Sequence, residues 1–544
     1  MPPKINIMVK PSTRVDRLFS PILIILALGA FLLLFGLDNR PFWQDEAETA
    51  GLAKNVLKYG VPRAYDGVNI ISQEQGREYD RNFLWRWSPW LQIYVTAAAF
   101  RLGGLTTFAG RLPFALFGLG CIFLVYRLVR HNFGDRTWAL CAATLLTCSV
   151  PFLLFARQCR YYSLGAFFTL MSLYTFREEW QSRFSTALLL CLSIGFLFYT
   201  NYLLFFSYVI PAFLIGIWLY PQEFPLKRTA ILTLATFIII APGLLLFRIQ
   251  EQSQIINLIA IPKNLENYFR DLIQFMIPLP IAAYLLWRWR RVFWTRAGIP
   301  EESGEKFILF LGLIIAGNII FLSLAPQCEY RYVVHLYPLA AIILGWVIVR
   351  AWRYDKISGV LLALLLFFTN WLCLVPMEWL QINNRPNYTN RHMLTYPNLP
   401  LWLFLAELFT PYPDVNGNFI RFFQTQARPG DIILTTYGDL PLQFYTPFQV
   451  IGGLQGKISP SRAPDWVVSR YELRYKRNYH LQDSERFIRE KLSLAADYQA
   501  IILPWEDEPF GNRADPYHHR FVPAARPLAQ AVIYKKVMPI QHVP

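Results

Sequence analysis

The chain has 544 residues, of which 54% are hydrophobic and only 16% are charged, and its formal net charge is +16. A soluble domain carries about 25% charged residues, so this composition excludes an ordinary soluble enzyme. A nucleic-acid-binding protein is also disfavoured, because residues 377–544 carry 18 Lys and Arg against 15 Asp and Glu and so lack a strong basic excess. We expect no nucleic-acid partner.

The hydrophobic residues gather in runs that are long enough to span a bilayer. A membrane core of roughly 30 Å needs about 20 apolar residues per helix. Such runs predict eleven spanning helices, near residues 21–37, 110–127, 137–155, 162–176, 184–200, 202–220, 229–247, 271–288, 307–325, 332–349 and 357–376. The runs then stop, so we predict a transmembrane domain over residues 1–376 and a second domain over residues 377–544. All seven Cys lie in the first domain, so no disulfide framework supports the second.

Basic residues predict the orientation of these helices. Lys4, Lys10, Arg14 and Arg17 precede the first run, and no cleavage site of small residues follows it, so we expect an uncleaved helix with a cytoplasmic N-terminus. Every predicted inner loop then carries at least two Lys or Arg, as cytoplasmic loops do. We predict a multi-pass protein of the plasma (inner) membrane, with residues 377–544 on the extracytoplasmic side.

Residues 38–109 form one long outer loop in this topology. The segment Ser88–Leu102 is apolar enough to span, but a span there would place the later basic loops on the wrong side. It is therefore predicted to be an interfacial helix. Trp85 and Trp87 before this helix, and Trp90 and Tyr94 within it, fit the headgroup region, where aromatic residues collect.

Three acids follow the first helix directly, in the sequence Trp43-Gln44-Asp45-Glu46-Ala47-Glu48. A short helix is predicted over 46–59, with Asp45 near its start. Carboxylates beside a bilayer are costly unless they are solvated, paired or used. One use is to accept the proton of an attacking hydroxyl and to stabilise an oxocarbenium-like transition state. The structural alternative is that the acids only favour the N-terminus of a surface helix.

Arginines occur in two further segments predicted to lie outside. Arg157 and Arg160 follow the third helix, and Arg331 precedes a late helix that also contains His335. Guanidinium groups bind phosphate oxygens in a bidentate manner, so these residues could hold a lipid phosphate. The alternative is that they extend toward the interface beside aromatic residues. His335 is better read as a polar residue in helix packing.

Together these segments resemble the protein O-mannosyltransferase and aminoarabinose transferase superfamily, over roughly residues 35–350. The matching motifs are Trp43-x-Asp45-Glu46 with Asn55, Gly60 and Pro62, Gly110-Arg111-Leu112-Pro113, Phe133-Gly134-Asp135-Arg136, Ala156-Arg157-x-x-Arg160-Tyr161-Tyr162 and Arg331-Tyr332 with Pro338. The resemblance implies the GT-C fold, a polytopic helical bundle with interfacial helices in its first outer loop. It also implies a glycosyltransferase (EC 2.4 class) that moves one sugar from a polyprenyl-phosphate carrier, of undecaprenyl or dolichyl type, to an extracytoplasmic hydroxyl or phosphate, usually with inversion.

The same resemblance assigns roles to individual residues. Asp45 becomes the base and Glu46 its catalytic neighbour. A lysine-proline pair that holds the lipid phosphate in aminoarabinose-type members is replaced here by Trp87-Ser88-Pro89, and Arg86 is a substitute. The predicted phosphate ligands are Arg86, Arg157, Arg160 and Arg331, and the predicted substrate contacts are Trp43, Glu48, Tyr161 and Tyr162.

The expected partners are a lipid-linked sugar donor, the bilayer, and a glycan, lipid or protein acceptor. Related oligosaccharide transferases carry a second acidic motif where this chain has Arg160-Tyr161-Tyr162. The resemblance therefore predicts a reaction without a metal ion, and we expect no cofactor.

The C-terminal segment has the pattern of a small α/β domain. Short apolar runs at 431–437, 465–469 and 500–504 predict strands, and residues 483–494 have helical spacing. Strands that alternate with helices favour a partly parallel sheet, with 531–534 as an edge strand. Asp515–His519 is read as a surface loop rather than a metal cluster. The domain could recognise the acceptor, cover the active site, or serve structure alone.

Two other functions compete with the transferase. A lipid or polysaccharide transporter needs paired repeats and ionisable residues near the bilayer midplane, whereas the predicted helices carry their charges at the ends. A non-catalytic assembly protein is the other alternative.

Overall fold

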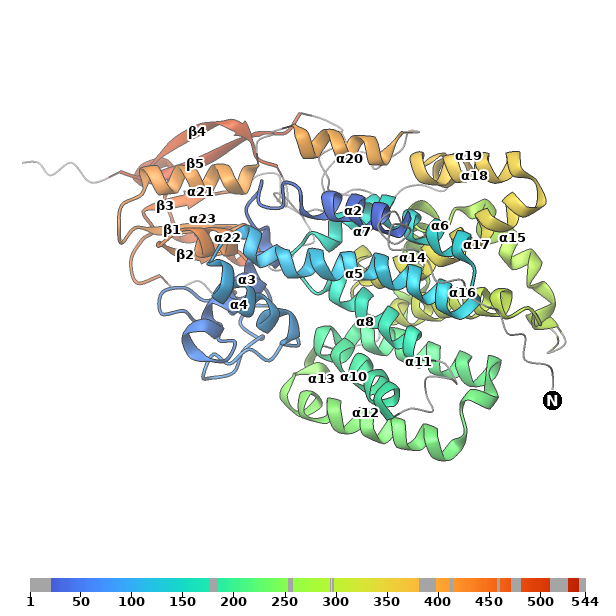
Figure 1. Ribbon diagram of the computed structural model, residues 1–544. Coiled ribbons are helices and arrows are strands. Elements are labelled where there is room, and N and C mark those ends of the chain that lie inside the picture. Colours follow the sequence, from blue (N-terminus) through green and yellow to red (C-terminus); the bar gives the residue numbers. More distant parts are fainter. Residues whose placement is uncertain are drawn as a thin grey trace, which may run out of the picture.

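The computed structural model describes residues 21–176, 184–252, 258–293, 295, 298–380, 398–410, 414–456, 460–470, 481–508 and 527–537. A bundle of long helices occupies one end, and a small sheet flanked by helices occupies the other (Figure 1). The helices α3 (Gln44–Tyr59) and α4 (Leu91–Gly103) of the first outer loop lie between them. The N-terminal basic residues and Asp515–His519 fall outside the described ranges.

Hydrophobic runs of the sequence form most of the helices of the bundle, and shorter or more polar segments form the others. The helices are α2 (Pro21–Leu34), α5 (Thr107–Phe133), α6 (Arg136–Cys148), α7 (Val150–Ala156), α8 (Tyr162–Thr175), α10 (Phe184–Thr200), α11 (Tyr202–Leu219), η1 (Pro221–Glu223), α12 (Leu226–Leu246), α13 (Ile249–Gln252), α14 (Ile261–Phe275), α15 (Leu279–Arg288), η2 (Arg290–Phe293), α16 (Ser303–Ser323), η4 (Tyr330–Leu336), α17 (Tyr337–Tyr354), α18 (Lys356–Phe368), α19 (Trp371–Trp379) and α20 (Pro400–Phe409). In the described part of the chain, five helices are long and apolar enough to cross a membrane, or up to eight if each of three bent pairs forms one span. The chain is a multi-pass membrane protein, and the count of eleven spans stays a prediction.

Three of the predicted spans are bent rather than continuous. The pair α6–α7 bends by 66°, α14–α15 by 105° and α18–α19 by 85°. The sharpest bend precedes Pro278 and Pro280, whose rings cannot continue the hydrogen-bond ladder of a helix. Pro151, at the start of α7, explains a second break in the same way. The apolar run of a sequence shows that a segment crosses the membrane, but it does not show where the helix breaks.

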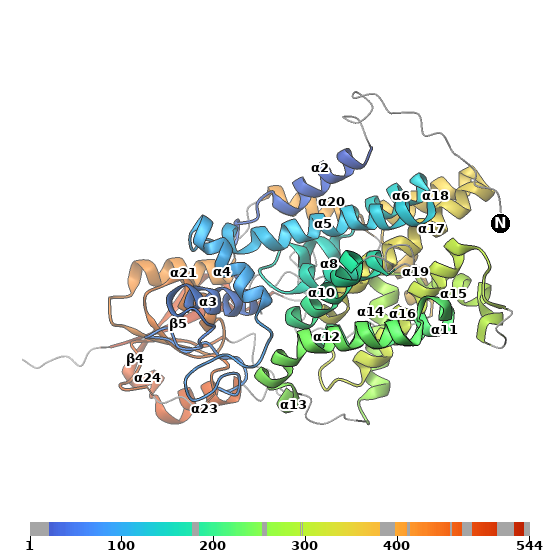
Figure 2. The same cartoon turned by 60° about the horizontal axis from the view of Figure 1, so that its bottom comes forward.

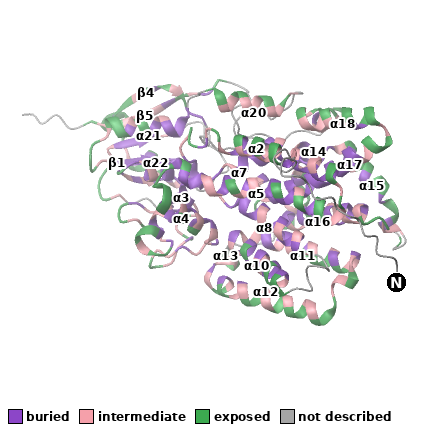
Figure 3. Ribbon diagram, in the orientation of Figure 1, coloured by how far each residue is buried: buried purple, intermediate pink, exposed green. Residues whose placement is uncertain are grey.

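The centre of the bundle is α17, whose residues from Tyr337 to Val349 are all buried. It packs closely on α6, because a Cβ at Gly345 would lie 2.9 Å from the backbone nitrogen of Ala142. By contrast, α12 and α18 are apolar but mostly uncovered, as lipid-facing helices are. Figure 3 shows both patterns.

The described parts of the loops predicted to be cytoplasmic lie at the end of the bundle far from the sheet (Figure 2). Arg288 donates to Glu305 at 2.8 Å and Arg350 to Glu302 at 3.2 Å, while Arg353 pairs with Asp135 at 2.5 Å. A common side for these loops agrees with the predicted topology. Which side of the membrane they face stays a prediction.

The C-terminal domain contains a five-stranded sheet in the order β2-β1-β3-β5-β4. Its elements are α21 (Val415–Gln426), β1 (Ile432–Thr435), α22 (Asp439–Tyr445), β2 (Gln449–Gly452), β3 (Trp466–Val468), α23 (Leu481–Lys491), α24 (Leu494–Asp497), β4 (Tyr498–Glu506) and β5 (Gln530–Lys536). Strands β2, β1 and β3 are parallel and the remaining pairings are antiparallel, so the predicted partly parallel sheet is confirmed.

One expectation for this domain was wrong, and one of its strands was not predicted. The sequence pattern predicts an edge strand at 531–534, but β5 lies inside the sheet between β3 and β4. The sequence pattern does not predict strand β2. This strand has only four residues, and only three residues separate it from the end of α22. The helix α20 packs on the bundle, with Phe404 in its core. We therefore propose that the C-terminal domain begins near Asp414 rather than at residue 377.

Candidate active site

Three segments that lie far apart in sequence meet at the outer-loop end of the bundle. They are the start of α3, the turn 157–161 between α7 and α8, and the start of η4. The first turn of α3 is fixed by Glu46, whose carboxylate accepts a hydrogen bond from the backbone N–H of Trp43 at 3.3 Å. This arrangement places Asp45, Glu48, Arg160 and Arg331 in one cluster, which we call the Asp45 cluster.

Asp45 stands between two cations. Its Oδ2 accepts a hydrogen bond from Nη1 of Arg331, and Nη2 of Arg160 lies 3.9 Å from the same oxygen. Asp45 is 7% exposed, so water screens these charges only weakly. A carboxylate that holds two guanidinium groups in one place is a preformed receptor for a second anion, provided that the anion can compete for those groups.

Arg160 connects Asp45 to a second acid. Its Nη1 donates to Oε1 of Glu48 at 2.7 Å and to the hydroxyl of Thr49 at 2.9 Å. The other oxygen of Glu48 accepts from the side-chain amide of Gln73 at 2.7 Å. Burial alone would lower the pKa of Arg160, but Glu48 and then Asp45 outweigh it and raise that pKa above its usual value. Arg160 therefore stays charged in this site.

Glu46 lies beside the Asp45 cluster but is fully enclosed. Arg111 binds both of its oxygens, with Nε at 2.8 Å from Oε1 and Nη2 at 2.6 Å from Oε2. The backbone N–H of Cys159 donates to Oε1 at 2.7 Å. Arg111 also donates to the carbonyls of residues 37, 40 and 41. These contacts join the start of α3, the turn 157–161 and α5. They indicate a structural role for Glu46 in connecting these three elements.

Two of the predicted phosphate ligands do not join the Asp45 cluster. Arg157 donates to the carbonyls of Leu32, Phe35 and Gly36 and so caps the C-terminus of α2. Arg86 donates to the carbonyls of Leu245 and Leu246 at the end of α12. Both side chains satisfy backbone carbonyls left open at a helix end. Arg86 and Arg157 are therefore left out of the phosphate site proposed below.

Buried aromatic rings line the inner side of the Asp45 cluster. Tyr161 and Tyr162 follow Arg160 directly, with ring centroids 4.6 Å apart, and Phe155 packs edge-on against Tyr162 at 4.8 Å. The indole N–H of Trp43 donates to Gln158 at 2.9 Å. All of the predicted substrate contacts thus lie in or beside the cluster, although Trp43 is buried and its indole N–H is already bonded to Gln158.

A further acidic segment next to the Asp45 cluster is absent from the sequence predictions. In the loop Gln73–Glu78, the carboxylate of Glu78 accepts from Ser72 and from the backbone N–H of Glu74. Burial, and then the nearby Glu78, raises the pKa of Glu74 to about 7. The sequence signal is the pair of Glu in Gln73-Glu74-Gln75-Gly76-Arg77-Glu78, but nothing in it indicates that this loop folds back onto Glu48.

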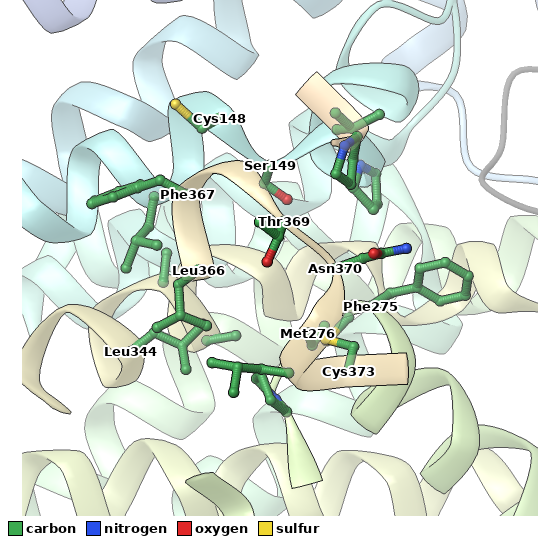
Figure 4. Close-up of a pocket in the computed structure, with 18 of the residues that line it drawn as sticks. Cys148, Ser149, Phe275, Met276, Leu344, Leu366, Phe367, Thr369, Asn370 and Cys373 are labelled. Carbon is green, nitrogen blue, oxygen red and sulfur yellow. The ribbon is translucent and has the colours of Figure 1, made fainter. Parts of the chain in front are cut away.

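A separate cavity of about 140 Å³ lies where the three bent helix pairs meet (Figure 4). Ser149, Thr369 and Asn370 come from the breaks themselves, and Met276 and Cys373 complete a mixed lining. Among the described residues, no acid or Arg lines it, and none of its lining residues belongs to the Asp45 cluster. In the described ranges, no group of three His, Cys, Asp or Glu side chains is arranged to hold a metal ion. The expected independence from metal ions stays a prediction.

Comparison with known proteins adds two findings. Residues 88–246 match the family model described as dolichyl-phosphate-mannose-protein mannosyltransferase. Two crystal structures of ArnT from Cupriavidus metallidurans are similar in fold, each with 13% sequence identity. The structure bound to undecaprenyl phosphate has a TM-score of 0.54 and the match covers 96% of this chain and 98% of that one. The apo structure has a TM-score of 0.55 with 94% and 97% coverage.

Among curated proteins, none matches the chain by sequence at a significant level. The match to ArnT nevertheless extends over nearly the whole of both chains, so it includes the bundle, the outer loop and the C-terminal sheet. The fold class expected from the sequence is thereby confirmed.

Proposed function

Because the chain has the GT-C fold of the protein O-mannosyltransferase and ArnT type, we propose that it transfers a single sugar from a polyprenyl-phosphate carrier to an acceptor on the outer side of the membrane. The relative from C. metallidurans binds undecaprenyl phosphate. A donor of the same chemistry suits this chain, since its Asp45 cluster combines cations with an apolar bundle beside it. The acceptor class is a glycan, a lipid or a protein.

The observation that carries the proposal is the contact of both Arg331 and Arg160 with one oxygen of Asp45. The phosphodiester of the donor is an anion that binds the same guanidinium groups. When it binds, it competes with Asp45 for them and leaves that carboxylate less tightly paired. Donor binding would thus make the base available at the moment when the sugar is in place.

The proposed step is an in-line displacement at the anomeric carbon. The acceptor oxygen forms a bond to that carbon while its proton passes to Asp45. The bond between the anomeric carbon and the phosphate oxygen breaks, and its electron pair stays on the phosphate. Arg331 and Arg160 stabilise the negative charge that develops there. Attack opposite to the leaving group inverts the anomeric centre.

The other residues of the Asp45 cluster support this geometry. Glu48 and Thr49 orient Arg160, and Tyr161 and Tyr162 place apolar surface beside the sugar and the lipid. We place this site on the extracytoplasmic face of a plasma or inner membrane, because the opposite end of the bundle gathers the basic loops.

The test uses the purified chain in proteoliposomes with a labelled polyprenyl-phosphate sugar and a membrane extract as the source of acceptors. We expect the label to leave the lipid carrier, and Arg331→Gln and Arg160→Gln to abolish this release. Arg290→Gln is the matched control, because Arg290 is exposed and contacts Trp287 in another part of the bundle. Label that crosses the bilayer while still attached to its carrier would instead support a transporter. Release that is unaffected by both Arg variants would contradict the proposed site.

A further inference from the structure

The C-terminal domain contacts the start of α3 directly. The side-chain amide of Gln44 donates to Oδ1 of Asp439 at 2.8 Å, and Gln44 immediately precedes Asp45. Both side chains are buried. Asp439 begins α22, and Leu440 belongs to the same hydrophobic cluster as Phe42 and residues of α3. The helix α22 therefore packs against the segment that carries Asp45.

A second contact holds the segment just before α3. The hydroxyl of Tyr445, at the end of α22, accepts from the backbone N–H of Phe42 at 3.0 Å. It also forms a hydrogen bond with the hydroxyl of Thr107 at 2.6 Å. Thr107 is the first residue of α5, so Tyr445 connects the domain to both the outer loop and the bundle.

A third contact joins the outer loop to the edge of the sheet. The side chain of Asn69 donates to the carbonyl of Phe448 at 3.0 Å and accepts from the backbone N–H of Val450 at 2.8 Å. Gln443 donates to the carbonyl of Ile70 at 3.2 Å. Asn69 thus pairs with the backbone at the start of β2 as a neighbouring strand would, and it fixes the loop that follows α3.

From these three contacts we infer that Gln44, Asp439 and Tyr445 are positioning residues, and that the C-terminal domain sets the place of Asp45 relative to Arg331 and Arg160. The inference rests on the proposed function, and it gives the domain a role in the transfer step itself. The bundle supplies the two cations and holds Glu46, which follows Asp45, through Arg111, whereas the domain holds Gln44, which precedes Asp45.

The geometry makes this contact sensitive to small changes. Asp439 Oδ2 also accepts from Gln455 at 3.2 Å, and Gly453 lies so close that a Cβ there would overlap the carboxylate, so the Asp439 side chain has little room to shift toward this backbone. Movement at Gln44 must be taken up by α3. A misplacement of about 1 Å can reduce a reaction rate by about a hundredfold.

The test exchanges the two partners of the buried hydrogen bond. Gln44→Glu places a second carboxylate against Asp439, and at about pH 8 like charges in a buried site repel. We expect kcat for transfer to fall about tenfold or more while KM for the donor changes little, since the phosphate ligands are untouched. Adding Asp439→Asn restores the pair with its direction reversed, because the amide introduced at position 439 donates to the new carboxylate while its oxygen still accepts from Gln455. We expect the double variant to regain most of the lost kcat.

Gln499→Glu is the matched control, because Gln499 is exposed on β4 and the chemical change is the same. It should leave transfer unchanged. Elution as a single species in detergent and retained binding of polyprenyl phosphate establish that Gln44→Glu is folded. Wild-type kcat in folded Gln44→Glu, or no recovery in the double variant, would overturn the inference. Failure of the wild-type chain to release sugar would instead overturn the proposed function.

Discussion

Replacement of Asp45 by Asn removes the proposed base while most of the surrounding Asp45 cluster keeps its contacts. The substitution keeps the shape of the side chain and removes one negative charge and one proton acceptor. Arg160 keeps Glu48 at 2.7 Å and Thr49 at 2.9 Å, so that part of the Asp45 cluster should remain in place. Arg331 loses its carboxylate partner, but its side chain is 22% exposed, so we expect a loss of about 1–3 kcal/mol in stability, below that of a fully buried pair.

The expected effect on catalysis is larger than the loss of stability, and it is a decrease in kcat. A positioned general base contributes about 10²- to 10⁴-fold to a rate. This factor corresponds to about 3–5 kcal/mol of activation free energy. Because the variant also removes the anion that competes with the donor phosphate for Arg331 and Arg160, KM for the donor should stay the same or fall.

Steady-state release of labelled sugar in proteoliposomes measures both constants. Asp38→Asn serves as the control, since Asp38 is an exposed acid of the same outer loop. If Asp45→Asn keeps kcat within about tenfold of the wild-type value, Asp45 is not the base. If instead KM for the donor rises strongly, Asp45 contributes to donor binding and the proposed competition with phosphate is wrong.

Other substitutions separate structural from functional roles. Arg111→Ala leaves the fully buried carboxylate of Glu46 without its bidentate partner, so thermal unfolding in detergent should show a loss of about 3–5 kcal/mol. Arg157→Ala should lower the unfolding temperature by releasing α2, yet leave binding of polyprenyl phosphate unchanged in a lipid-binding assay. Burial raises the pKa of Asp439 from 3.8 to about 6, against hydrogen bonds from Gln44 and Gln455, so ionisation of this group opposes folding. The folded state should lose about 3 kcal/mol of stability from this group as pH rises from about 3, below the unfolded pKa, to about 7, above the folded pKa, and Asp439→Asn should lack this pH dependence in unfolding scans of the full chain. Gly345→Ala should destabilise the bundle by about 1–3 kcal/mol, because the new methyl group meets the backbone of α6.

The sequence by itself determined the class of the protein and the outline of its site. Apolar runs of sufficient length have few alternatives to membrane helices, because a bilayer leaves no other partner for the backbone. The ordered motifs around Asp45, Arg160 and Arg331 indicated the residues that the fold brings together. Short strands between polar loops also revealed the partly parallel sheet.

Only the tertiary structure decided which charged residues act and which ones hold the fold. Arg157 and Arg160 are three residues apart and look alike in sequence, yet one caps α2 and the other contacts Asp45. Glu46 and Asp45 are neighbours, yet one is enclosed by Arg111 and the other faces Arg331. The role of a guanidinium or carboxylate depends on the partner it meets in space, and the partners of Arg157 and Arg160 come from segments more than 100 residues away. A local sequence pattern contains no information about such distant contacts. The sequence therefore indicated the candidate residues, and only the tertiary packing showed which role each of them has.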